Sequence, residues 1–351
     1  MALRRVSIIG SGNWGSTIAK IVGNNIKKLP DYVTEVRMWV HEEIVDNCKL
    51  TEIINTKHEN IKYLPGITLP DNVVAIPDVC AVARDTDVLV IVMPHQFLSH
   101  TLSQMKSAVK KGAYAVSLMK GLALSDDHGI RLLTDCIREI LEIPCAVLMG
   151  ANLAVEVSQE NYCEATIGAV DAHIGSELKT LFQTDYFRIV VIKDEVGTEL
   201  CGALKNIVAV AAGVIEGLGY GDNTKAAIIR LGFMEMKTFI YEFFGCRNPQ
   251  EGTFLESCGV ADLITTCYGG RNKQMGIALA TTNEPLATLE KERLKGQSAQ
   301  GPLTAAEVYA MLEPKGLLEK YPLFAAVHRI CTRKLDPKGF LHCLANHPEH
   351  R

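Results

Sequence analysis

Two charged residues in apolar segments are well suited to proton transfer. Lys205 is at the front of the apolar helical stretch 199–217. A lysine there loses hydration, which lowers its pKa toward neutrality and lets it accept a proton from a hydroxyl group. Asp262 is also in an apolar setting and would be costly to bury unpaired, so we predict that Lys205 is its partner. The alternatives are a solvated lysine at a helix edge and an aspartate that caps a surface turn.

A third segment, Gly-Gly-Arg-Asn, ends with Arg271 and Asn272. Backbone N–H groups, a planar guanidinium and an amide would all donate hydrogen bonds, some of them in pairs, to a phosphate group. The segment therefore predicts a phosphate site. Read alone, the segment would favour the alternative, a surface turn with a structural aspartate cap.

The residues that would bring a cofactor to this chemistry are at the start of the chain. A β-branched run, residues 6–9, leads into Gly10, Gly12 and Gly15 and then into the helical segment 16–26. This order is typical of the phosphate-binding turn of a dinucleotide fold, in which the glycines allow a tight turn, backbone approach to a pyrophosphate and close helix packing. An ordinary turn between two core elements is the alternative.

The residues after the second predicted strand indicate which dinucleotide binds. His41, Glu42 and Glu43 follow residues 36–40, and neither arginine nor lysine occurs until Lys49. An acidic residue here would bond the adenosine ribose hydroxyls, whereas arginine would accept a 2′-phosphate. We predict NAD. The alternative is that the two glutamates begin a helix.

The alternation of short apolar runs with helical segments predicts how these residues are positioned. Such strands are typical of a parallel sheet buried on both faces, so we expect a doubly wound Rossmann-type domain, residues 1–192, followed by a mainly α-helical domain, residues 193–351. The predicted strands after the first are 36–40, 73–76, 88–92, 114–118, 146–149 and 187–192, and the predicted helices of the second half are 199–217, 224–244, 305–312 and 322–331.

Composition excludes several other classes of protein. The chain has 351 residues, 48% of them hydrophobic, and a formal net charge of −4. It has no basic block typical of nucleic-acid binding, and the apolar run 207–215 is too short to cross a membrane. Eleven cysteines lack disulfide or zinc-ligand spacing. We expect a cytoplasmic protein with no targeting segment and no metal.

Motifs along almost the whole length resemble one family, the NAD-dependent glycerol-3-phosphate dehydrogenases of the eukaryotic cytosolic type. The matching segments, in family order, are GSGNWGS, LTEIINTKHENIKYLPG, MPHQF, VLMGANLA, ELCGALKNIVAV, GDNTKAAIIRLG, ESCGVADLITTCYGGRN and NHPEH. The resemblance implies reversible hydride transfer between glycerol 3-phosphate with NAD and dihydroxyacetone phosphate with NADH, and a homodimer.

The resemblance also implies roles for individual residues. Lys205 would be the general acid and base, and Asp262 would support it. The implied cofactor residues are Gly10, Ser11, Gly12, Asn13, Trp14, Gly15, Phe97, Ala154, Arg271 and Gln300. The implied substrate residues are Lys120, Asn206, Thr266, Arg271 and Asn272, with Arg271 and Asn272 acting on the phosphate.

Two positions depart from the family pattern, which usually has an aromatic residue at His41 and a lysine at Ser298. Loss of that lysine would remove a cation near the cofactor. These departures keep open a low-activity NAD(H)-binding regulator. A related dehydrogenase that acts on another phosphorylated polyol is a further alternative, because the Gly-Gly-Arg-Asn segment suits any phosphate.

Overall fold

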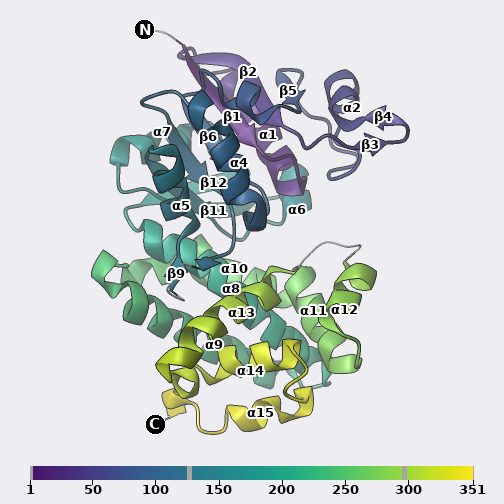
Figure 1. Cartoon of the computed structure of the whole chain (residues 1–351), viewed down its shortest axis with the longest axis vertical. Coiled ribbons are helices and arrows are strands. Elements are labelled where there is room, and N and C mark those ends of the chain that lie inside the picture. The colour runs from purple at the N-terminus through teal and green to yellow at the C-terminus, as the bar shows by residue number, and fades with distance from the viewer. Residues whose placement is uncertain (1–2, 125–128, 295–298, 351) are drawn as a thin grey trace. The chain divides into compact units, whose positions relative to one another are not determined.

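The computed structural model describes residues 3–124, 129–294 and 299–350 and divides into two compact units (Figure 1). The first unit comprises residues 1–119 and 133–195, and the second comprises residues 120–132 and 196–351. The predicted boundary between residues 192 and 193 left residues 120–132 in the first domain, whereas in the structure they belong with the second unit. This excursion brings Lys120 into the helical unit.

The first unit is built on an eight-stranded sheet in the order β12-β11-β10-β7-β6-β1-β2-β5. Its strands are β1 (Arg4–Ile9), β2 (Tyr32–Trp39), β5 (Val73–Ile76), β6 (Val88–Ile91), β7 (Tyr114–Ser117), β10 (Cys145–Met149), β11 (Cys163–Gly168) and β12 (Phe187–Ile192). Every residue of β6, β7 and β10 is buried, which explains why these strands are apolar runs without alternation.

The sheet is parallel except where β10 pairs antiparallel with β11. Sequence reasoning missed β11, because Glu164, Thr166 and Gly168 interrupt its apolar pattern. The other predicted strands are present, most with ends that differ by a residue or more. The doubly wound architecture is therefore confirmed, with one antiparallel pair added to it.

Helices of the first unit form two groups. They are α1 (Asn13–Ile26), α2 (Leu50–Lys57), α3 (Val79–Ala83), α4 (Leu98–Met105), α5 (Leu133–Leu141), α6 (Ala154–Ser158) and α7 (Ala172–Phe182). Helix α1 contacts α6 and α7, whereas α4 contacts α3 and α5. Strand β1 pairs with β2 on one side and β6 on the other, so the chain reverses its winding direction beside β1. Ligands of doubly wound folds bind at this point, beyond the carboxyl ends of the strands.

The second unit is mainly helical, as predicted, and its helices run from teal through green to yellow in Figure 1. They are α8 (Glu195–Gly217), α9 (Asp222–Phe244), α10 (Asp262–Tyr268), α11 (Gly270–Thr281), α12 (Leu286–Arg293), α13 (Gln300–Leu312), α14 (Pro322–Cys331) and α15 (Phe340–Cys343). Two short hairpins, β3 (Ile44–Val45) with β4 (Cys48–Lys49) and β8 (Ala123–Leu124) with β9 (Ile130–Arg131), complete the strands found in the described residues.

Helix α8 is the centre of the second core. By length and composition it could cross a membrane, but 89% of its most apolar window is buried inside the structure. A Cβ atom on Gly213 would lie 2.1 Å from the carbonyl oxygen of Lys273, and one on Gly276 would lie 2.1 Å from that of Val210. Because both positions are glycine, α8 and α11 approach closely, which places the residues of α11 beside those of α8.

Candidate active site and cofactor site

Lys205 on α8 is 3% exposed and is paired with Asp262, as predicted. Its Nζ lies 2.5 Å from Asp262 Oδ1 and also donates a hydrogen bond to Thr266 Oγ1. Burial penalises the charged amine and is the main reason that the pKa of Lys205 is lowered to about 7; Asp262 opposes this shift and Lys120 adds to it. The amine can therefore accept or release a proton near neutral pH.

Asp262 begins α10 and is 2% exposed. Its Oδ2 accepts a hydrogen bond from Lys120 Nζ at 2.8 Å, so one carboxylate lies between two lysines. Thr266, one turn along α10, donates its hydroxyl proton to the Asp262 carbonyl oxygen at 2.7 Å. The turn of α10 thus presents a carboxylate and a hydroxyl oxygen to Lys205.

Sequence reasoning assigned Lys120 to the substrate but missed its ion pair with Asp262. The two residues are 142 positions apart in the chain. Nothing in the local pattern around either one indicates the other. Lys205, Asp262, Thr266 and Lys120 therefore form one cluster, which we call the lysine–aspartate cluster, entirely within the second unit.

The two predicted substrate asparagines are buried and bonded to each other. Asn272 Nδ2 donates to Asn206 Oδ1 at 2.8 Å, and Asn272 Oδ1 accepts from the backbone N–H of Gly301 at 2.8 Å. Asn206 Nδ2 in turn donates to the Gly202 carbonyl oxygen at 3.3 Å. This chain of bonds fastens the first turn of α13, which begins with Gln300, to α8.

Arg271 is in the first turn of α11 and is exposed. Gly269, the N-cap residue of α11, has no side chain that could accept hydrogen bonds from the N–H groups of that turn. These N–H groups and the guanidinium are the donors that the sequence predicted for a phosphate.

The glycine turn of the first unit has the shape that a pyrophosphate requires. Gly10 has a φ of +126°, and a Cβ on Gly15 would lie 2.2 Å from the Gly10 carbonyl oxygen. A Cβ on Gly12 would meet nothing within 4 Å, and as the N-cap residue of α1 Gly12 offers no side-chain bond to the first turn. The residues present therefore fit a dinucleotide, whose phosphates the open side of Gly12 and the N-terminus of α1 would receive.

Substitution of two of these glycines should separate folding from binding. The Gly15→Ala change forces its Cβ into the Gly10 carbonyl, so the free energy of unfolding should fall by about 1–3 kcal/mol. Gly12 has an ordinary φ of −62°, and a Cβ there would meet open space. In Gly12→Ala the free energy of unfolding should therefore be unchanged, while the affinity for NADH falls. Thermal unfolding and NADH fluorescence titration measure the two effects. An unchanged NADH affinity in Gly12→Ala would contradict this assignment.

The remaining predicted cofactor residues of the first unit are in the glycine turn, in the first turns of α1 and α6, and in the short 3-10 helix His95–Phe97 after β6. Trp14 packs edge-on against Phe187 of β12, with ring centroids 6.1 Å apart. The Ala154 carbonyl oxygen accepts a hydrogen bond from Thr17 of α1 at 3.1 Å, so the start of α6 adjoins the first turn of α1. Phe97 is 56% exposed after β6, Ser11 is buried and Asn13 is exposed. In the second unit, Gln300 Oε1 is a buried acceptor that has no partner among the described residues.

Both acidic residues considered for the ribose are bonded elsewhere. Glu42 accepts hydrogen bonds from the Thr51 N–H at 3.2 Å and the Thr51 hydroxyl at 2.7 Å, in the first turn of α2. Glu43 accepts from Tyr63 Oη at 2.6 Å and pairs with Lys62. The alternative that they begin a helix is wrong, because α2 begins only at Leu50. Glu42 nevertheless stabilises that helix from outside it.

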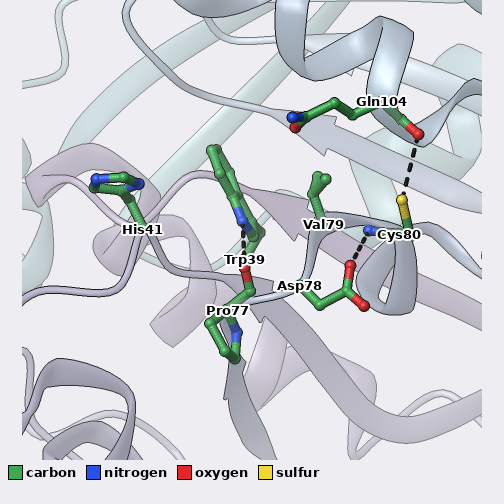
Figure 2. Close-up of a pocket in the computed structure, with 7 residues that line it drawn as sticks. All are labelled: Trp39, His41, Pro77, Asp78, Val79, Cys80 and Gln104. Atoms are coloured by element: carbon green, nitrogen blue, oxygen red, sulfur yellow. Dashed lines mark hydrogen bonds between the residues drawn. The ribbon is translucent and has the colours of Figure 1, made fainter.

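An open hollow of about 490 Å³ lies at the ends of β2 and β5 (Figure 2). Its lining residues are Trp39, His41, Pro77, Asp78, Val79, Cys80 and Gln104. Trp39 Nε1 donates to the Pro77 carbonyl oxygen at 3.1 Å, which holds the indole in place. The departure at His41 is therefore beside the region where a doubly wound fold receives adenosine. Ser298, the second departure, lies outside the described residues.

Across residues 3–124, 129–294 and 299–350, no group of three or more His, Cys, Asp or Glu side chains is arranged to hold a metal ion.

Comparison with known proteins agrees with this geometry. Residues 5–174 match the family model for the N-terminus of NAD-dependent glycerol-3-phosphate dehydrogenase, and residues 194–342 match the model for its C-terminus. The human protein named cytoplasmic glycerol-3-phosphate dehydrogenase [NAD(+)] is 54% identical over 351 residues, covering 100% of both chains.

Solved structures of glycerol-3-phosphate dehydrogenases are also similar to this chain. A glycerol-3-phosphate dehydrogenase from Saccharomyces cerevisiae superimposes with a TM-score of 0.88 at 45% identity, covering 98% of this chain and 100% of that one. The protein called DsGPDH from Dunaliella salina has a TM-score of 0.93 at 40% identity; the match covers 98% of this chain but 60% of the Dunaliella chain. The chain belongs to the NAD-dependent glycerol-3-phosphate dehydrogenase family.

Proposed function

We propose that this protein is an NAD-dependent sn-glycerol-3-phosphate dehydrogenase that interconverts glycerol 3-phosphate and dihydroxyacetone phosphate. The observation that carries the proposal is the buried lysine–aspartate cluster, in which the pKa of Lys205 is lowered to about 7. An amine of this kind can take the hydroxyl proton of a secondary alcohol in one direction and return it in the other.

Each residue of the cluster has a separate task in this reaction. Bound NAD supplies the acceptor of the hydride that leaves the alcohol carbon. Lys205 takes the hydroxyl proton at Nζ during oxidation, and in its protonated form it polarises the carbonyl and donates that proton during reduction. Asp262 holds Lys205 in place and balances the charge of both lysines. Thr266 Oγ1 accepts a hydrogen bond from the same amine, which restricts the orientation of the amine.

The substrate phosphate is assigned to Arg271 and the first turn of α11, together with the remaining donor of the Asn272 amide. These groups are remote from the proton-transfer residue along the chain, yet the close approach of α8 and α11 brings their helices together. Binding energy at the phosphate would orient the reacting carbon. Lys120 and Asn206 complete the proposed substrate residues.

Substitution of Arg271 tests the phosphate site. In Arg271→Ala, kcat/KM for dihydroxyacetone phosphate should fall by about a hundredfold or more, because a charge-assisted pair of bonds is lost. Arg271→Lys should recover only part of this loss, since a single ammonium cannot form the paired bonds. For unphosphorylated dihydroxyacetone, the control substrate, kcat/KM should differ little between the parent enzyme and the Arg271 variants. Equal losses for both ketones would contradict the assignment.

The direct test of function is NADH oxidation by the purified protein across phosphorylated and unphosphorylated ketones. We expect turnover with dihydroxyacetone phosphate and little with its unphosphorylated counterpart. NADH binding without turnover would instead support the NAD(H)-binding regulator. Preference for a different phosphorylated ketone would support a related polyol-phosphate dehydrogenase. The intact lysine–aspartate cluster favours the first outcome.

We also propose a cytoplasmic homodimer with small-molecule substrates as its ligands, rather than a nucleic-acid-binding or membrane-spanning protein. The relative from human is named as cytoplasmic, and the formal charge of −4 does not suit a polyanion. The first domain, residues 1–192 without the excursion 120–132, would hold the cofactor, and the second, residues 193–351 with that excursion, the substrate and the proton-transfer residue. Light scattering after size-exclusion chromatography tests the dimer, since a monomeric mass would exclude it.

A further inference from the structure

Asn60 is a completely buried asparagine that the reaction itself does not use. It lies in the loop between α2 and β5. Its Nδ2 donates to the Ser11 carbonyl oxygen at 2.8 Å and to Ser16 Oγ at 2.9 Å, and its Oδ1 accepts from the Tyr63 N–H at 3.2 Å. Both amide protons and the amide oxygen therefore have partners, which is the arrangement expected of a side chain that holds a fixed conformation.

These bonds converge on the glycine turn. Ser16 Oγ also donates to the Ser11 carbonyl oxygen, at 3.2 Å, so Asn60, Ser11 and Ser16 form a closed triangle of hydrogen bonds. In a planar trans peptide the carbonyl oxygen and the following N–H point in opposite directions. Holding the Ser11 carbonyl against Asn60 therefore directs the N–H of Gly12 away from Asn60. A rotated Ser11–Gly12 peptide would turn that donor inward.

The loop that carries Asn60 is itself restrained. We call residues 58–69 the brace loop; a bridge between Glu59 and Thr68 and a bond from the Leu69 N–H to the His58 carbonyl oxygen at 2.7 Å close it. Through Lys62 and Tyr63 the same loop also holds Glu43, just beyond the end of β2. The brace loop thus fastens both the glycine turn and the segment after β2.

We propose that Asn60 is a positioning residue for the cofactor, and that it sets the orientation of the Ser11–Gly12 peptide so that the Gly12 N–H is available to a dinucleotide pyrophosphate. The inference rests on the proposed function for the identity of the dinucleotide. Asn60 touches no reacting atom. Asn60 holds the glycine turn in its binding conformation before the cofactor arrives. This lowers the entropic cost of cofactor binding.

The test compares Asn60→Ala with Asn25→Ala. Asn25 is in the last turns of α1, the helix that follows the glycine turn, and its side chain also donates two hydrogen bonds to backbone oxygens, those of Leu181 and Gln183. Both variants should unfold at a lower temperature. Only Asn60→Ala should raise Kd and KM for NADH, by about tenfold, while kcat at saturating NADH stays within about twofold of the parent enzyme.

A second variant and a pair of ligands distinguish a changed orientation of the Ser11–Gly12 peptide from a general loss of stability of the first unit. Asn60→Asp can still accept from the Tyr63 N–H but can no longer donate to the Ser11 carbonyl oxygen or to Ser16 Oγ, so it should bind NADH as weakly as Asn60→Ala does. ADP-ribose, which contains the pyrophosphate, should lose affinity for Asn60→Ala, whereas adenosine should not. Equal losses for ADP-ribose and adenosine, or an NADH Kd within twofold of the parent's, would overturn the proposal. Since Kd is measured without turnover, failure of the parent to reduce dihydroxyacetone phosphate would count against the proposed function alone.

Discussion

Replacing Lys205 with methionine is expected to lower kcat for dihydroxyacetone phosphate reduction by about a thousandfold, within the range for loss of a general acid or base. Methionine is similar in length but cannot carry a proton. Asp262 keeps its bond to Lys120, so the variant should fold. Its Kd for NADH, measured by fluorescence in the absence of substrate, should be unchanged because Lys205 acts on the substrate.

Two controls make the Lys205 result specific. Lys225 is another buried lysine of the second unit, paired with Glu216 at 2.7 Å, and Lys225→Met should lose stability while it retains turnover. Lys205→Arg keeps a cation that does not release its proton, so oxidation of glycerol 3-phosphate should remain severely impaired. If Lys205→Met kept a tenth or more of the parent kcat, proton transfer by Lys205 would be ruled out.

Replacing Asp262 with asparagine should lower kcat by about a hundredfold to a thousandfold and shift the pH profile. Asp262 raises the pKa of Lys205, whereas burial and Lys120 lower it. Without the carboxylate the pKa of Lys205 falls below about 7. Oxidation requires the neutral amine, so its acid limb should move to lower pH. Reduction requires the protonated amine and should suffer more at neutral pH.

Lys120→Met should shift the pKa of Lys205 in the direction opposite to that of Asp262→Asn. Lys120 lowers the pKa of Lys205, so its removal should raise that pKa and move the acid limb of glycerol 3-phosphate oxidation to higher pH. Profiles of kcat/KM against pH for both variants check the signs, with thermal unfolding as the control for folding. Shifts in the same direction would contradict the electrostatic account of the cluster.

Several elements could be read from local pattern because their cause is local. Strands β6, β7 and β10 are buried on both faces and must be apolar throughout, so they were recognisable as runs. Strand β11 was not, since its polar residues do not differ from those of a loop. Lys205 and Asp262 were each predicted from apolar surroundings, and their pairing followed from the cost of burying either one alone.

Other site features depend on contacts that local pattern does not contain. Glu42 and Glu43 were predicted to bond the ribose or to begin a helix; no helix begins at them, and the structure bonds them to Thr51, Tyr63 and Lys62. One amide proton of Asn272 bonds Asn206 and its amide oxygen accepts from Gly301, so only the second amide proton remains for the phosphate that the sequence predicted. Whether a polar side chain has a donor to spare is decided by its neighbours in space.

By itself the sequence determined the dinucleotide turn and the doubly wound architecture, because each depends on residue types at short spacing, and motifs along the whole chain determined the family. It also predicted Lys205 as the proton-transfer residue. Only the tertiary structure decided that Lys120 shares the carboxylate of Asp262, that Asn60 holds the glycine turn, and that the pKa of Lys205 is lowered to about 7. The physical reason is that burial and charge act over a few ångströms in space, between residues that the chain separates by tens to hundreds of positions.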